Sequence, residues 1–141
     1  MFKKTIFALM KVEKKTRLKL LFFALLFGVL MSVPYLVPHC GPVVLVAFIP
    51  LLYMDKIASE EGIRPFWWYH YLAFLLFNIF STFWIWFVSE VGSIAAIALN
   101  ALQMSIVFAL YRWSRKVFTY RWLSYLFLIV AWIAWEHVYF E

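Results

Sequence analysis

Residues 67–90 read WWYHYLAFLLFNIFSTFWIWFVSE, and residues 91–113 continue as VGSIAAIALNALQMSIVFALYRW. Each segment is long and apolar enough to cross a bilayer as a helix, because about 20 such residues span the hydrocarbon core. The junction between them predicts a tight reversal. Polar amides inside the two segments, at Asn78, Asn100 and Gln103, need hydrogen-bond partners in lipid. We therefore expect the two helices to pack against each other.

The composition of the whole chain agrees with a membrane protein. Of its 141 residues, 67% are hydrophobic and 14% are charged, whereas soluble domains are about half apolar and a quarter charged. We therefore predict an all-α integral membrane protein whose surface mostly faces lipid. The net charge of +6 does not indicate nucleic acid, because the basic residues lie outside the apolar segments and form no basic face with interleaved aromatics.

Three further apolar segments, at residues 20–33, 43–54 and 122–140, complete a predicted bundle of five spans with the central pair at 66–89 and 91–111. The first two are shorter than a straight span needs. The segment between them is rich in proline and glycine and cannot be regular helix. Two arrangements fit this part of the chain: two short or kinked spans, or one re-entrant hairpin.

The basic residues predict the topology. Residues 1–19 hold seven Lys and Arg, residues 55–65 hold two and residues 112–121 hold four, while the alternate connections hold none. Positively charged loops stay on the cytoplasmic side, so we expect five crossings, with the N-terminus inside and the C-terminus outside. The chain then divides into a basic cytoplasmic leader over 1–19 and a helical bundle over 20–141. We favour a solvated leader, although its apolar residues would also fit an amphipathic helix on the membrane surface.

The candidate site residues are polar groups in the last three spans: Asn78, Thr82, Asn100, Gln103 and Glu136. Helical spacing places the first two on one stripe, which also includes Tyr71 and Ser89, and places the next two on one face of the following span. Gly92 and Ala96 on that face predict close approach of two backbones. We favour hydrogen bonds between helices as the role of the mid-span polar groups, and the alternative is a polar cavity or a groove for lipid head groups.

The sequence contains no catalytic or metal-binding motif. Cys40 is the only cysteine, so neither an intrachain disulfide nor a multi-cysteine metal site is possible. Its neighbour His39 does not make a nucleophilic pair without a third, orienting group. Glu136 and His137 are adjacent and point in different directions on a helix. We therefore predict no cofactor, no metal ion and no catalytic residue in this chain.

Short motifs in a fixed order resemble one known family. They are PHCGP at 38–42, Pro50-Leu51-Leu52, Tyr71, Phe74, Phe77-Asn78, Thr82, Trp84-Ile85, Gly92, Asn100-Ala101-Leu102, Met104, Arg112-Trp113 and Trp135-Glu136. From about residue 18 onward, the chain is similar to the N-terminal membrane part of bacterial apolipoprotein N-acyltransferase. Each motif is weak alone, and the resemblance comes from their order and spacing.

The resemblance implies a function in lipoprotein maturation. Members of this family transfer an acyl chain from a membrane phospholipid to the N-terminal amine of an apolipoprotein, in the bacterial inner membrane. Their Glu-Lys-Cys catalytic residues belong to a nitrilase-like domain, which has no counterpart here. We therefore expect a fragment that is inactive alone, with phospholipid, apolipoprotein and the missing domain as partners. The alternative is a small standalone membrane scaffold or partner-binding protein.

Overall fold

The computed structural model describes residues 2–64 and 66–140, with side chains for 13–64 and 66–139. Its elements are α1 (Phe2–Leu36), α2 (Val43–Glu60), α3 (Trp67–Thr82), the 3-10 helix η1 (Phe83–Phe87), α4 (Glu90–Val117) and α5 (Arg121–Phe140). The described residues contain no strand, and the all-α prediction is confirmed. Several side chains of the predicted leader, among them Lys3, Lys4 and Lys11, lie outside the described set.

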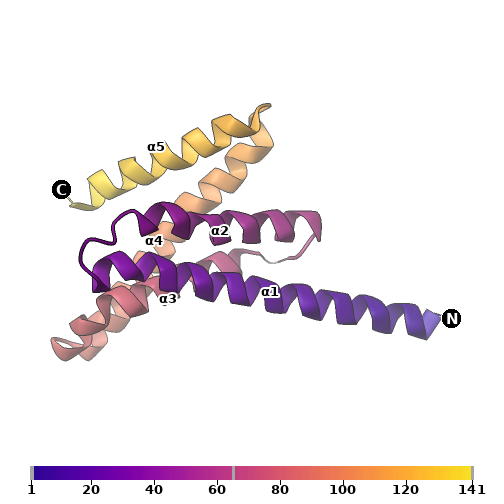
Figure 1. Cartoon of the computed structure of the whole chain (residues 1–141), viewed down its shortest axis with the longest axis horizontal. Helices are drawn as coiled ribbons and strands as arrows, with labels where there is room; N and C mark the ends of the chain where they lie inside the picture. Colours follow the sequence, from indigo (N-terminus) through magenta and orange to yellow (C-terminus); the bar gives the residue numbers. More distant parts are fainter. Residues whose placement is uncertain (1, 65, 141) are drawn as a thin grey trace.

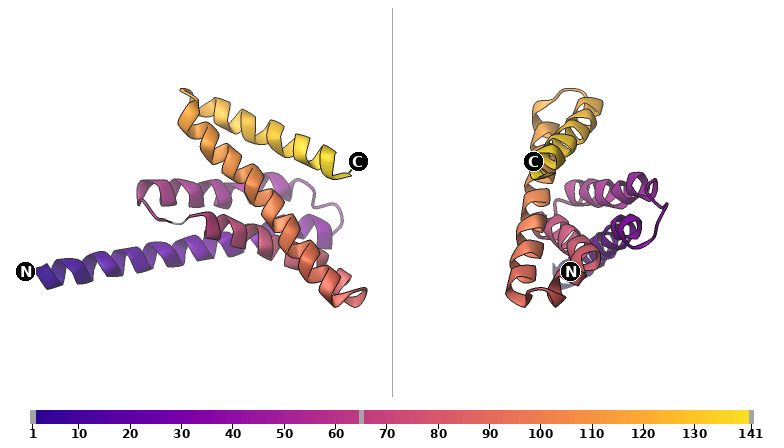
Figure 2. Two further views of the ribbon diagram at one scale, coloured as in Figure 1. Left: turned by 180° about the vertical axis from the view of Figure 1, so that it is seen from behind. Right: turned by 90° about the vertical axis from the view of Figure 1, so that its left-hand side faces the viewer.

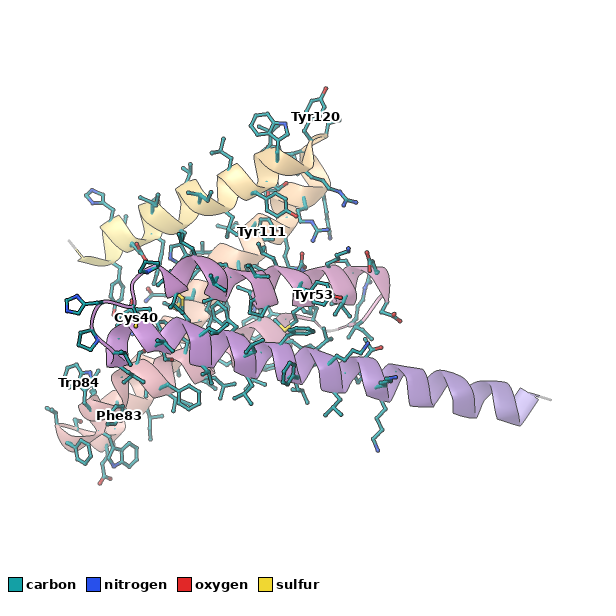
Figure 3. The ribbon with its side chains drawn as sticks, in the orientation of Figure 1. Cys40, Tyr53, Phe83, Trp84, Tyr111 and Tyr120 are labelled. Carbon is teal, nitrogen blue, oxygen red and sulfur yellow. The ribbon has the colours of Figure 1, made fainter. Side chains whose placement is uncertain are left out.

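Successive α-helices run in alternate directions (Figure 1). The N-terminus and the α2–α3 and α4–α5 connections lie at one end of the bundle, which we call the basic end because these segments hold the Lys and Arg residues. The α1–α2 loop, the α3–α4 junction and the C-terminus lie at the opposite end, called the far end. Figure 3 shows Tyr120 at the basic end, and Cys40 and Trp84 at the far end. This arrangement is the one that five alternating passes require.

Four helical segments are long and apolar enough to cross a membrane: Glu13–Leu36, Trp67–Phe87, Glu90–Val117 and Arg121–Tyr139. The helix α2 is not among them, because charged residues occupy its final turns. It nevertheless lies antiparallel to α1 along its whole length (Figures 1 and 2). The predicted leader and first span form one continuous helix, α1, which extends well past the bundle at its N-terminal end.

The segment predicted as the third span has two parts, because α3 ends at Thr82 and η1 follows. Two hydroxyls bond back to carbonyls one turn earlier, Ser81 to Phe77 O at 2.8 Å and Thr82 to Asn78 O. Such bonds compete with the regular helical ladder and bend helices. Ser89 lies beyond this break, so it does not continue the polar stripe of α3.

Ser89 instead caps the next helix. Its backbone is extended, with φ −159° and ψ 115°, and its hydroxyl accepts a hydrogen bond from Gly92 N at 3.1 Å. The prediction that Gly92 and Ala96 bring two helices together is wrong, because a Cβ at Gly92 would meet only this cap and Gly92 is exposed. Glu90 lies in the first turn of α4, where the helix dipole stabilises a carboxylate.

The close helix contact is made by α1 and α3. Ala24, Gly28 and Ser32 repeat every four residues on the buried face of α1, and Ala24 and Ser32 are 0% and 2% exposed. A Cβ built at Gly28 would lie 2.8 Å from Leu76 Cβ and 3.3 Å from Phe77 N on α3. Small residues spaced in this way let helix backbones approach in lipid.

The centre of the bundle is a cluster of five aromatic rings, one from each α-helix. Phe74 of α3 contacts Phe27 of α1 at 5.2 Å, Trp132 of α5 at 5.7 Å and Phe108 of α4 at 6.2 Å between ring centroids. Phe48 of α2 closes the cluster against Phe27 at 5.9 Å and Trp132 at 5.0 Å. Ring pairs of this kind contribute about 0.5–1.5 kcal/mol each beyond buried area. The cluster fixes α2 and α5 relative to the central pair.

Candidate functional site

Two of the predicted site residues join α4 to α5. Trp135 Nε1 donates a hydrogen bond to Gln103 Oε1 at 3.2 Å, and the Tyr139 hydroxyl donates to Asn100 Oδ1 at 3.3 Å. The expected hydrogen-bonding partner was the preceding helix, α3. Because both bonds lie toward the far end, the C-terminal half of α5 is attached to α4 by polar contacts there.

Asn78 and Thr82 form a separate group on α3. Asn78 is 2% exposed, and its Nδ2 donates to Phe74 O at 2.9 Å and approaches Met104 Sδ on α4 at 3.5 Å. Thr82 donates to the Asn78 carbonyl. Most of the hydrogen bonding of these two residues is therefore within their own helix. These four predicted residues therefore form two groups and not one site.

Glu136 lies at the head of an apolar groove between α2 and α5. The groove has a volume of about 380 Å³, and ten residues line it: Val44, Leu45, Phe48, Leu52, Tyr125, Leu128, Ile129, Trp132, Ile133 and Glu136. Trp132 Nε1 donates to Glu136 Oε1 at 3.0 Å, which fixes the carboxylate over the groove. The groove is therefore apolar along the helices and carries one carboxylate near the far end.

A second apolar groove lies between α3–η1 and α4. Its volume is about 680 Å³, and its walls include Tyr71, Phe83, Trp86 and Ile94. Of these, Tyr71 donates a hydrogen bond from its hydroxyl to Ala98 O at 3.5 Å. Phe83 projects from η1 at the far end (Figure 3). Both grooves have an apolar lining that suits hydrocarbon chains.

A buried charge cluster at the basic end was not predicted from the sequence. Asp55 is 0% exposed, and each of its carboxylate oxygens accepts from one arginine of α4. Arg112 Nε lies 2.7 Å from Oδ1, and Arg115 Nη1 bonds Oδ2. The Arg112 guanidinium also lies 4.3 Å from the ring centroid of Phe66, a cation–π contact. This cluster joins the end of α2 to the end of α4.

The helical spacing of buried residues in α2 could have identified Asp55 as buried. Residues 55–65 were predicted to be a hydrophilic loop, but α2 continues through Asp55 to Glu60. Ala47, Leu51, Asp55 and Ala58 follow at intervals of four, four and three, and all four are buried. That periodicity belongs to one helix face. The drop in hydropathy after Met54 concealed it.

The described side chains include no group of three or more His, Cys, Asp or Glu residues arranged to hold a metal ion. Cys40 is half-buried in the far-end loop. Acyl transfer needs an activated nucleophile and a second group that moves its proton. The geometry of the described residues provides two apolar grooves, one of which carries the Glu136 carboxylate.

Comparison with known proteins identifies a protein family. A family model described as the apolipoprotein N-acyltransferase N-terminal domain matches residues 6–140. Neither the search of curated proteins nor the search of solved structures found a match. The match covers nearly the whole chain, including all of α2, α3 and α4.

Proposed function

Because the chain belongs to the family of the apolipoprotein N-acyltransferase N-terminal domain, we propose that it forms the membrane part of an enzyme that acylates the N-terminal amine of apolipoproteins. The family match over residues 6–140 is the observation that carries the proposal. A phospholipid of the bacterial inner membrane supplies the acyl chain. The chemistry takes place in a nitrilase-like catalytic domain with which this bundle works.

The groove between α2 and α5 supports a role in holding the acyl donor. Its apolar walls accommodate an acyl chain along Phe48, Leu128 and Ile133, while Glu136 meets the polar part of the lipid. A carboxylate only accepts hydrogen bonds, so Glu136 suits the ammonium or hydroxyl groups of a lipid head. Holding the donor in this way places its ester at the membrane surface, where oriented reactants gain rate.

The chemistry of acyl transfer separates the role of the membrane bundle from that of the catalytic domain. A thiolate attacks the ester carbonyl of the phospholipid, forming a thioester and releasing the lysophospholipid. The apolipoprotein amine then attacks the thioester and restores the thiol. Both steps need a nucleophile and acid–base groups that the catalytic domain provides. The chain described here contributes the binding and orientation of an insoluble substrate.

The proposal predicts a functional effect of Glu136. In the native host, we expect Glu136→Gln to lower N-terminal acylation of lipoproteins about fivefold to tenfold, because a hydrogen bond to a charged group contributes about 1.5–3 kcal/mol before exposure weakens it. Mass spectrometry of lipoprotein N-terminal peptides measures the ratio of acylated to free amine.

Glu61→Gln is the matched control, because Glu61 is an exposed carboxylate outside the groove. We expect that variant to leave acylation unchanged. Deletion of the chain should leave the lipoprotein amines free. Full acylation in the deletion strain would contradict the proposal and would favour a membrane scaffold without a role in acyl transfer.

A further inference from the structure

A polar pocket lies at the basic end of the bundle, between α2, α3 and α4. It has a volume of about 350 Å³ and is lined by Ser59, Trp67, His70, Ala109, Arg112, Trp113, Arg115 and Lys116. Its lining is far more polar than that of the two apolar grooves. Three basic side chains, one hydroxyl and two indole rings therefore surround one space.

The charges around the pocket do not balance. Asp55 bonds to both Arg112 and Arg115 but neutralises only one positive charge. Lys116 is exposed and adds another. Glu60, which follows the pocket residue Ser59 in the chain, lies 4.0 Å from Lys56 on α2 and does not line the pocket. The pocket therefore carries an excess of about two positive charges, which favours an anion.

His70 provides an independent sign of a ligand. It is 1% exposed and lines the pocket, and its Nδ1 atom has no hydrogen-bond partner among the described residues. Buried polar atoms are rarely left unpaired, because each costs about 1–3 kcal/mol. Ring contacts with Phe66 at 5.6 Å and Phe108 at 5.4 Å hold the imidazole in place. An acceptor or donor atom from a bound molecule would complete its hydrogen bonding.

We propose that this pocket binds the phosphate group of an anionic phospholipid in the leaflet at the basic end. The arginines and Lys116 would provide charge and hydrogen bonds, which phosphate accepts strongly. Trp67 and Trp113 favour a lipid source over free phosphate, because tryptophan rings lie at the head-group level of membranes. Trp113 is 58% exposed and so is available to a lipid beside the pocket. The inference concerns lipid binding and does not depend on the acyl-transfer role.

Native mass spectrometry of the purified full chain in detergent tests the proposal, with phosphatidylglycerol and phosphatidylcholine as competing probes. We expect one phosphatidylglycerol to be retained in preference to phosphatidylcholine. Lys116→Gln should weaken phosphatidylglycerol binding about fivefold, the contribution of one basic residue near an anionic lipid. His70→Leu should also weaken it, because leucine cannot form the hydrogen bond that His70 Nδ1 would make to the lipid.

Arg121→Gln is the matched control, because Arg121 is an exposed basic residue at the same end but outside the pocket. It should leave the preference unchanged. Equal losses for Lys116→Gln and Arg121→Gln would overturn the proposal in favour of a diffuse basic surface. Displacement of the lipid by inorganic phosphate at equal concentration would also overturn it, by assigning the pocket to the free ion.

Discussion

Replacing Asp55 with asparagine should lower the free energy of unfolding by about 3 kcal/mol, the low end of the cost of breaking a buried ion pair. The Asp55 side chain is 1% exposed, and asparagine would leave Arg112 and Arg115 without the carboxylate that pairs with them. The arginine side chains are 32% and 29% exposed, so they can turn partly toward water, which limits the loss. Reversible unfolding by SDS in mixed micelles measures the change.

Glu60→Gln is the control for that measurement, because it also changes a carboxylate to an amide, five residues later in α2. Glu60 is 64% exposed and lies 4.0 Å from Lys56. Exposed pairs of this kind contribute about 0–1 kcal/mol, so stability should change by less than about 0.5 kcal/mol. Equal effects of the two substitutions would show that the Asp55 cluster does not join α2 to α4.

Replacing Gly28 with leucine should lower the free energy of unfolding by about 3 kcal/mol, the upper range for overpacking a filled interior. Even the first added carbon would lie 2.8 Å from Leu76 Cβ, with backbone atoms of α3 at 3.3 and 3.4 Å behind it. A side chain there forces α1 and α3 apart, and it breaks the contact of Ser32 Oγ with Phe77 O at 3.5 Å. The same SDS titration measures the loss.

Gly28→Ala and Gly41→Ala form a matched pair for this contact. The first should be destabilising, by an amount between wild type and Gly28→Leu, because its single added carbon already meets Leu76. The second should be neutral, because a Cβ at Gly41 meets nothing within 4 Å. If Gly28→Ala were as stable as Gly41→Ala, the close approach of α1 and α3 would be wrong.

The sequence allowed prediction of the helices but not of all their contacts. Long apolar segments define membrane helices because lipid requires every backbone group to bond within its own segment. Hydropathy does not say which face meets which neighbour. The amides at Asn100 and Gln103 were expected to pack on α3, yet they bond to Tyr139 and Trp135 of α5.

Small residues illustrate the same limit. The pair at Gly92 and Ala96 has the right spacing for close packing, but Gly92 belongs to the exposed first turn of α4. Gly28 and Ser32 have the same spacing and do meet a neighbour. The spacing is necessary for close approach but does not select the helix that approaches. That choice depends on the arrangement of the whole bundle.

The charge cluster was missed for a different reason. Counting Lys and Arg treats each as a topological signal, and this count correctly grouped the basic segments at one end of the bundle. It cannot distinguish Arg112 and Arg115, which pair with a buried carboxylate, from Arg121, which is exposed. A charged residue that continues the buried face of a helix, as Asp55 does in α2, is the sequence pattern that indicates a buried ion pair.

The proposed function rests on the orientation of the bundle. The end of the α2–α5 groove that carries Glu136 must face the side of the membrane where apolipoproteins are acylated. Cys40, the only cysteine, lies at the far end, and Tyr120 lies at the basic end (Figure 3). A membrane-impermeant maleimide applied to intact spheroplasts should label Cys40. In a Cys40→Ser, Tyr120→Cys variant, labelling should require permeabilised membranes. Labelling of the Cys40→Ser, Tyr120→Cys variant in intact spheroplasts, together with no labelling of Cys40 in the wild-type protein, would contradict this orientation.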